Sequence, residues 1–332
     1  MMLLAMGAQN LLSTSISAGL TVDSFAELLR RAEALNEVGS YLETISIDTA
    51  IPGTKTKIRW HRIAHDGTHN KPDVEKLIGK LMKLLVDFAC PRSEIEAAHE
   101  RFVKNKSSEG FAALQEKARR LFTKADRAGE VGELLLFYLA ERQLGYPQVL
   151  CKMPLKTNPS VHAHGADGVH ASLHPTTNHL RLHWGEAKLW ADLGAALDAC
   201  CLSLREMLLC PPGAKKSKTR DLELLRDNLD LSNPVVEAAV IQYLNPDDAL
   251  SNKVEFCGLA LVGFNYADYA ALSAEFLKPD AGAIAVRTAL WTEKIKEALE
   301  KHELIGLTID TLCVPCTSVE DIRREFKKAL GI

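Results

Sequence analysis

The order of the segments that follow Gly129 constrains the fold more than any other feature of this sequence. A helix is predicted over residues 129–145, because its apolar run ends at Gly145 and Pro147, residues that typically end helices. Three strands and then a long helix with one apolar face are predicted after it, at residues 146–157, 165–173, 179–190 and 191–209. This succession of one helix, three strands and a second helix predicts a compact mixed α/β unit.

The segments around this unit predict two domains. At 332 residues and 47% hydrophobic composition, the chain is long enough to form two units, each with its own core. Helical and strand-like patterns precede the unit, at residues 24–35, 56–67 and 74–89. Further helices and strands that extend the sheet are predicted after it, at residues 220–231, 254–264, 292–302, 304–314 and 319–330. We therefore predict an α-rich amino-terminal domain at residues 1–125 and a second domain at residues 126–332.

The charge and the cysteines of the chain exclude several classes of protein. A formal net charge of -3, from 40 basic and 43 acidic side chains, gives no overall basic character, so contact with nucleic acid has to come from local patches. The eight cysteines lack the regular spacing of a disulfide framework, which indicates a reducing compartment. No apolar run reaches the roughly 18 residues of a membrane span, and the first residues lack a basic leading region, so we expect a cytoplasmic protein.

Three residues on the second and third predicted strands carry the candidate chemistry. Asp167 opens the second strand, and Glu186 lies in the middle of the third. Because side chains two positions apart on a strand point to the same face, Glu186 and Lys188 project together and Ala187 faces away. The pattern therefore predicts a carboxylate beside a cation on one face of a strand, with a second carboxylate on the neighbouring strand.

The surroundings of Glu186 and Lys188 give these charges a partly buried position. Apolar side chains flank them, among them Leu182, Trp184 and Leu189. Burying a charge is costly unless the charge is paired or bound to a metal. Convergent carboxylates that hold a divalent cation are also what hydrolysis of a phosphodiester needs, because the cation polarises the phosphoryl oxygen and lowers the pKa of the attacking water. The site therefore predicts metal-dependent phosphodiester cleavage.

Together with the preceding helix, these residues resemble the PD-(D/E)xK nuclease superfamily. The motif positions match Asp167, Glu186 and Lys188, and Glu133 resembles the helical glutamate of restriction-endonuclease-like members. The resemblance implies a restriction-endonuclease-like mixed sheet flanked by helices. It also implies that Asp167 and Glu186 bind Mg²⁺ or Mn²⁺, that Glu133 holds a second metal ion or an ordered water, and that Lys188 orients the attacking water and stabilises the phosphate. Ala166 stands where the superfamily motif has proline.

More narrowly, the runs GEVGELLLFYLAERQLG, GADGVHA and LRLHWGEAKLW are similar to those of the HamA family, the effectors of the bacterial Hachiman antiphage system. This resemblance implies a DNA nuclease of antiphage defence that acts with a helicase encoded beside it. The chain has no Gly-x-x-x-x-Gly-Lys-Ser/Thr loop, so ATP use would belong to the partner. We expect the amino-terminal domain, with its apolar helices and the strand around Trp60, to dock the helicase.

Three alternatives remain open from the sequence alone. Glu130 lies one helical turn before Glu133 and fits the same helical position. The same residues fit a nuclease that acts on RNA, because they recognise the phosphodiester and not the sugar. A non-catalytic nucleic-acid-binding subunit would be indicated by the loss of an acidic motif residue, and none is missing.

Other clusters of reactive or charged side chains fit plainer roles. Several of the clustered histidines alternate along strands and point to opposite faces, which argues against a zinc site. Cys313 and Cys316 form a lone CxxC pair, for which we expect buried thiols. The clustered histidines are His162, His164, His170, His174, His179 and His183. Two segments are rich in basic residues. The first could contact nucleic acid or a protein partner and contains Lys55, Lys57, Arg59 and Arg62. The second could contact phosphates or only solvent and contains Lys215, Lys216, Lys218 and Arg220.

Overall fold

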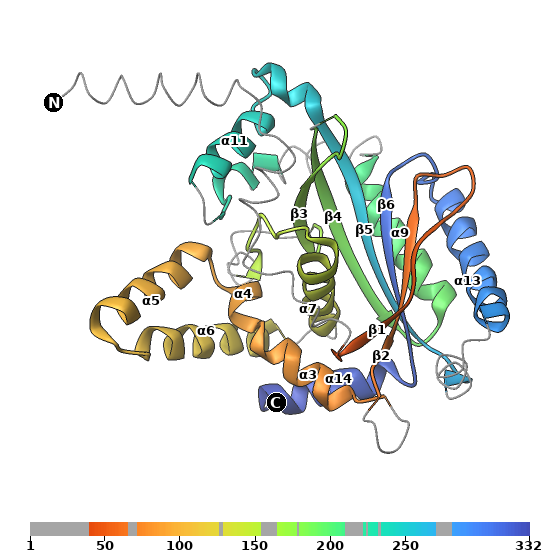
Figure 1. Ribbon diagram of the computed structural model, residues 1–332, viewed down its shortest axis with the longest axis horizontal. Helices are drawn as coiled ribbons and strands as arrows, with labels where there is room; N and C mark the ends of the chain where they lie inside the picture. Colours follow the sequence, from red (N-terminus) through yellow and green to blue (C-terminus); the bar gives the residue numbers. More distant parts are fainter. Residues whose placement is uncertain are drawn as a thin grey trace.

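In the computed structural model of the chain, six strands form one mixed sheet with helices on both of its faces (Figure 1). The architecture is therefore α/β with a sheet flanked by helices, as the sequence predicts. The structure describes residues 40–65, 72–125, 129–153, 165–177, 179–209, 222–223, 225–231, 234–269 and 281–332.

The strands have the order β1-β2-β6-β5-β4-β3 across the sheet. The four inner strands run parallel to one another, whereas each edge strand is antiparallel to its neighbour. The strands span Leu42–Ala50 (β1), Lys57–Ile63 (β2), Gly168–Leu173 (β3), Leu180–Trp190 (β4), Val254–Asn265 (β5) and Ile309–Cys316 (β6).

Helices α7, α3 and α14 lie on one side of the sheet, and α9 and α13 lie on the other (Figure 1). Helices α5 and α6 form a hairpin that extends away from the sheet (Figure 1). None of the described helices has the length and apolar composition that crossing a membrane requires. The helices span Val74–Lys83 (α3), Leu85–Ala89 (α4), Arg92–Asn105 (α5), Glu109–Ala125 (α6), Glu130–Leu139 (α7), Leu193–Leu208 (α9), Pro234–Leu244 (α11), Ala281–Lys301 (α13) and Val319–Leu330 (α14), with a π-helical turn at Ala140–Leu144 (η2) and a 3-10 turn at Ala249–Lys253 (η3).

The side chains of β4 alternate between two apolar cores. Ala187 and Leu189 belong to the core that includes α7, whereas Trp184 belongs to the core that includes α9. Because successive side chains of a strand point to opposite faces, Glu186 and Lys188 project on the α9 side. The candidate acidic residue and lysine therefore lie between the sheet and α9.

The strand predicted at residues 146–157 is wrong for the part that the structure describes, which ends at Met153. This part forms only isolated bridges, one of them between Gln148 and His170. Pro147 has no amide hydrogen to donate to a ladder, and this limits regular pairing beside β3. The segment instead lies along β3 as an irregular connection.

The helices of the amino-terminal part are more numerous than predicted. The helix predicted at residues 74–89 divides at Leu84 into α3 and α4. The polar stretch after it forms α5 and α6, and β1 and α11 have no counterpart among the predicted elements. Among the described residues of α5, only Arg92 and Ala98 are buried, so its apolar periodicity is weak. The helix predicted at residues 24–35 lies outside the described residues.

The sheet continues across the predicted domain boundary at residue 125. Residues 57–60 of β2 pair in parallel with residues 310–313 of β6. Strands from both sides of the boundary thus share one hydrogen-bonded sheet, and whether residues 1–125 fold as a separate domain stays a prediction.

Phe122→Ala is expected to destabilise the whole protein as one unit. Phe122 is fully buried, and its ring packs between Phe88 of α4 and Phe326 of α14, with ring centroids 5.8 Å and 5.7 Å apart. Removing a buried phenylalanine costs about 3–5 kcal/mol. The free energy of unfolding, measured by urea denaturation, is expected to fall by about that amount in a single transition.

Val103→Ala is the control, because Val103 lies exposed on α5 and its loss is expected to change stability by less than about 0.5 kcal/mol. Two separate transitions, with only the first shifted by Phe122→Ala, would contradict one cooperative unit.

Candidate active site

Asp167 lies where β3 begins to pair with β4. Gly168 pairs with Gly185, and the amide of Asp167 donates to the carbonyl of Gly185 at 2.7 Å. Two residues further along the same edge of β4, the amide of Ala187 donates to Oδ2 of Asp167 at 2.9 Å. The carboxylate thus takes the place that a strand carbonyl would have in a longer ladder.

Glu186 and Lys188 form an ion pair beneath α9. Nζ of Lys188 lies 2.5 Å from Oε1 of Glu186, and the two side chains are 23% and 7% exposed. The thiol of Cys200 in α9 donates to the carbonyl of Glu186 at 3.6 Å, and Ser203 of the same helix lies close enough to the carboxylate to lower its pKa. The helix that follows β4 therefore holds Glu186 at both its side chain and its backbone.

The charges at this site act strongly on one another. Burial and the negative charge of Asp167 raise the pKa of Glu186 to about 7, against the opposing effect of hydrogen bonds from Lys188 and Ser203. Burial by itself lowers the pKa of Lys188, but the hydrogen bond to Glu186 and the charges of Glu186 and Asp167 raise it on balance. The lysine therefore stays charged, while the two carboxylates repel each other.

Two carboxylates that repel each other fit a divalent cation, which would relieve the repulsion. Hard oxygen donors favour Mg²⁺ or Mn²⁺ over softer metals. Among the residues that the structure describes, no three His, Cys, Asp or Glu side chains are grouped closely enough to hold a metal ion. The pair of Asp167 and Glu186 would therefore need further oxygen ligands from water or substrate.

Helix α7 carries Glu133 toward the same end of β4, but on the other face of the sheet. Gly132 packs directly against β4, and both Glu130 and Glu133 are buried in the first turn of α7. Glu186 projects on the α9 side, whereas α7 covers the opposite face of the sheet. Glu133 stays a predicted site residue, and the choice between Glu133 and Glu130 stays open.

Two further cationic side chains reach this edge without having been predicted. The buried ammonium of Lys152 donates to the carbonyl of Ala166, the residue before the candidate aspartate. The guanidinium of Arg323 in α14 donates to the carbonyl of Leu189. The first contact spans 14 residues and the second 134, and neither follows the short-range periodicity of a helix or a strand.

Two histidines of the cluster and both cysteines of the CxxC pair lie in the core, whereas His174 and His179 are half-buried. Burial lowers the pKa of His170 and His183, that of His183 to about 3, so both rings are neutral. Cys313 and Cys316 are buried free thiols whose pKa burial raises, which confirms the expectation for them. Outside the described residues lie His162, His164 and the basic loop at residues 214–220.

The indole of Trp60 offers no surface to a partner, while docking of the helicase by the amino-terminal part stays a prediction. Trp60 is fully buried and packs against Trp291, with ring centroids 5.0 Å apart. Its neighbour Arg59 pairs with Asp310 at 3.0 Å. An indole on the inner strand β2 faces the core because α13 covers it.

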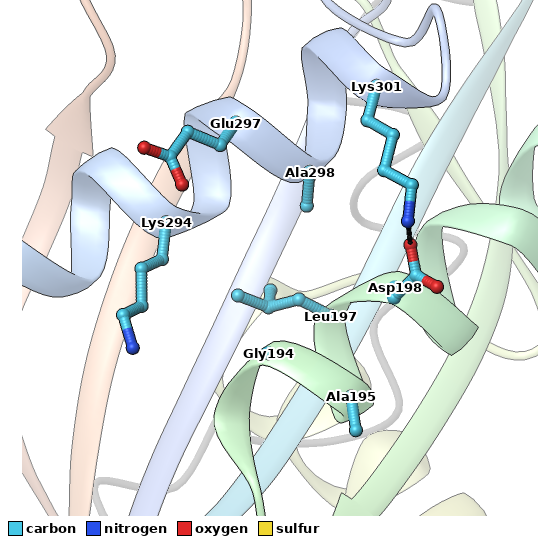
Figure 2. A pocket seen from close by; sticks show the side chains of 8 residues that line it. All are labelled: Gly194, Ala195, Leu197, Asp198, Lys294, Glu297, Ala298 and Lys301. Atoms are coloured by element: carbon cyan, nitrogen blue, oxygen red, sulfur yellow. Dashed lines mark hydrogen bonds and ion pairs between the residues drawn. The ribbon is translucent and has the colours of Figure 1, made fainter.

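A groove between α9 and α13 lies apart from the candidate residues. Figure 2 shows the ammonium of Lys301 beside the carboxylate of Asp198, 2.5 Å apart. The groove is lined by Gly194, Ala195, Leu197, Asp198, Lys294, Glu297, Ala298 and Lys301. Neither Glu186 nor Lys188 lines it, so the candidate chemistry lies along the sheet edge and not in this groove.

The fold and this edge define an α/β protein in which two carboxylates and a lysine converge at the edge of a mixed sheet. A family model described as HamA matches residues 39–330. Because the match covers most of the chain, the chain belongs to the HamA family. Membership associates the protein with Hachiman antiphage defence, as the resemblance in the sequence implies. No curated protein matches the chain.

Glu186→Gln is expected to stabilise the metal-free protein at neutral pH. The folded-state pKa of Glu186 is raised from 4.5 to about 7, so the stability that this group confers is present below about pH 4.5 and is lost as the pH rises through about 7. Glutamine has no charge to bury. The free energy of unfolding of the variant, relative to the unmodified protein, is expected to grow across this window in urea titrations with EDTA.

Addition of Mg²⁺ at pH 8 is expected to favour the unmodified protein, because a ligand that binds only the folded carboxylates stabilises the folded state. Glu96→Gln, on the exposed surface of α5, is the control for loss of a single carboxylate. A stability difference that does not vary with pH would contradict buried, mutually repelling carboxylates.

Proposed function

We propose that the chain is a metal-dependent DNA nuclease with a PD-(D/E)xK active site and is the effector of Hachiman defence. The observation that carries this proposal is the convergence of Asp167, Glu186 and Lys188 at one edge of β4. Two repelling carboxylates beside a charged lysine are costly to bury. A cation and an anionic substrate would offset that cost, and membership in the HamA family supports the biological setting.

In this proposal the two strand carboxylates hold the metal, and the lysine acts on the substrate. Asp167 and Glu186 would hold Mg²⁺ or Mn²⁺ at the edge of β4. The bound cation supplies the charge that polarises a phosphoryl oxygen and lowers the pKa of the attacking water. Lys188 orients that water and stabilises the negative charge that develops on the phosphate.

Other residues of the chain keep these groups in position. Ser203 holds the carboxylate of Glu186 from α9, and Lys152 holds the peptide that precedes Asp167. Glu133 would act from the α7 side, on an ordered water or a second cation. Fixing the reacting groups before substrate binds lowers the cost of reaching the transition state.

Glu186→Ala and Lys188→Ala are each expected to abolish cleavage, for different reasons. Loss of Glu186 removes metal-binding charge, so the affinity for Mg²⁺ in a calorimetric titration is expected to fall. Loss of Lys188 removes a nearby positive charge, so Mg²⁺ is expected to bind equally or more tightly. The cleavage rate is expected to fall on the order of 10²–10³-fold or more, because charge on the phosphate is no longer stabilised.

Asp198→Asn, an exposed carboxylate on α9, is the matched control and is expected to cleave normally. The substrates are supercoiled plasmid, linear DNA and RNA, each with and without the helicase encoded beside the chain. Full cleavage by either site variant would remove the active-site assignment. Cleavage of RNA alone would keep the site and change the substrate.

We also propose that the amino-terminal part docks the helicase, through the tip of the hairpin of α5 and α6. Phe102, Val103 and Phe111 are exposed there, and the two phenylalanine rings contact each other with centroids 6.1 Å apart. The hairpin extends away from the sheet (Figure 1). Exposed aromatic side chains are enriched at protein–protein interfaces, whereas isolated hydrophobic residues are common on any surface.

Phe102→Ser combined with Phe111→Ser is expected to weaken co-purification with the helicase and to leave DNA cleavage by the isolated chain unchanged. Val286→Ser combined with Leu290→Ser, at exposed positions of α13, is the matched control. Deletion of residues 1–120 is a poor test, because it removes β1 and β2 from the sheet. If only the α13 variant failed to co-purify with the helicase, the interface would be assigned to α13 instead.

A further inference from the structure

Trp190 is the last residue of β4 and lies on the same face as the candidate catalytic groups. Side chains at alternate positions of a strand share a face, so Trp190 follows Glu186 and Lys188 on the α9 side. Leu189, between them, is buried on the α7 side, whereas the side chain of Lys188 is 23% exposed and Trp190 is 42% exposed. The face that carries the candidate site therefore opens toward Trp190.

The exposure of Trp190 is unusual in this chain. The sequence has four tryptophans, and the other three, Trp60, Trp184 and Trp291, are buried. Two of these pack against other rings, Trp60 on Trp291 and Trp291 on Phe264. The exposed part of the Trp190 indole is therefore the one tryptophan surface among the described residues that a ligand can reach.

The position of Trp190 relative to Lys188 suits a nucleic-acid strand. Residues two apart on a strand are ~6.7 Å apart along the backbone, a span comparable with one nucleotide of an extended strand. A phosphate at Lys188 would therefore place the neighbouring base near Trp190.

A second cation reaches this end of β4 from the other side of the sheet. Arg323 of α14 donates to the carbonyl of Leu189, the residue before Trp190, and also pairs with Glu320 at 3.3 Å. An aromatic face with flanking cations is the combination by which proteins bind single-stranded nucleic acid, because bases stack on the ring and phosphates pair with the cations.

We propose that Trp190 stacks on the base next to the scissile phosphate, so that the chain acts where that base is unpaired. The inference rests on the proposed nuclease function and names its substrate class: single strands, frayed ends and gaps rather than intact duplex. In a duplex, both faces of each base are covered by neighbouring bases, so the stacking surface is closed to the indole. Trp190 would thus act as a binding and specificity residue and would leave metal binding unchanged.

Tryptophan fluorescence gives a direct test, because the three other indoles are buried. Oligothymidylate is titrated into the full chain in EDTA, where cleavage does not occur, and a fully paired duplex of the same length is titrated in parallel. Stacking is expected to quench the emission of Trp190 with the oligothymidylate and not with the duplex. Trp190→Phe is expected to lose the quenching and to keep most of the affinity, since phenylalanine still stacks.

Trp190→Ala is expected to weaken oligothymidylate binding on the order of tenfold, which corresponds to the loss of one stacked base. Its KM for single-stranded substrate is expected to rise by a similar factor, with affinity for Mg²⁺ unchanged in calorimetry. Leu290→Ala, another exposed apolar residue, is the control and is expected to bind normally. Melting temperatures of all variants show that each is folded.

The outcomes separate this inference from the proposed function. Quenching and tenfold weaker binding by Trp190→Ala, without any cleavage by the unmodified chain, would support the stacking site and remove the nuclease proposal. Normal cleavage with no quenching and no effect of Trp190→Ala would overturn the stacking site alone and assign the exposed indole to a protein contact.

Discussion

The hydrogen bonds of Asp167, the residue just before β3, to the backbone of β4 are the constraint on which the rest of the site depends. Its amide continues the ladder to Gly185, and its carboxylate accepts the amide of Ala187, so these contacts set where antiparallel pairing with β3 stops. Beyond that point Arg323 binds the carbonyl of Leu189. Charged side chains thus satisfy backbone groups that a longer β3 would otherwise pair. They leave a polar edge in a place where a continuous ladder would exclude a substrate.

Small residues let α7 and both strands approach closely enough to build this edge. A Cβ on Gly185 would lie 2.9 Å from Leu136 of α7 and 3.2 Å from the carbonyl oxygen of Gly168. Gly132 likewise leaves room for Leu189, since its Cβ would lie 3.3 Å from that side chain. Gly185 and Gly132, each of which precedes a candidate glutamate, therefore have a packing role. Their lack of a side chain lets α7, with its candidate helical glutamates, lie directly on the strands that carry the other site residues.

Local patterns in the sequence predict the strands that carry the site, but they do not predict the contacts around it. Alternation predicts β4 and places Glu186 and Lys188 on one face, as the structure has them. The contact of Ser203 with Glu186 depends on how α9 folds back over the sheet, which no periodicity encodes. Which glutamate of α7 belongs to the site stays undecided for a related reason. Every residue of α7 is buried, so the helix has no polar stripe that fixes its rotation and separates Glu130 from Glu133.

A buried polar network joins the strand of the candidate site to the amino-terminal part of the chain. Arg59 of β2 pairs with Asp310 of β6 at 3.0 Å, and the hydroxyl of Tyr146 donates to the same carboxylate at 3.2 Å. The Tyr146 ring stacks on His183 of β4 with centroids 4.1 Å apart, three residues before Glu186. Loss of either charge would remove a buried ion pair, so the network resists small shifts between these strands. The amino-terminal strands therefore help to set the position of β4, and a partner bound to that part of the chain would act on the scaffold of the site itself.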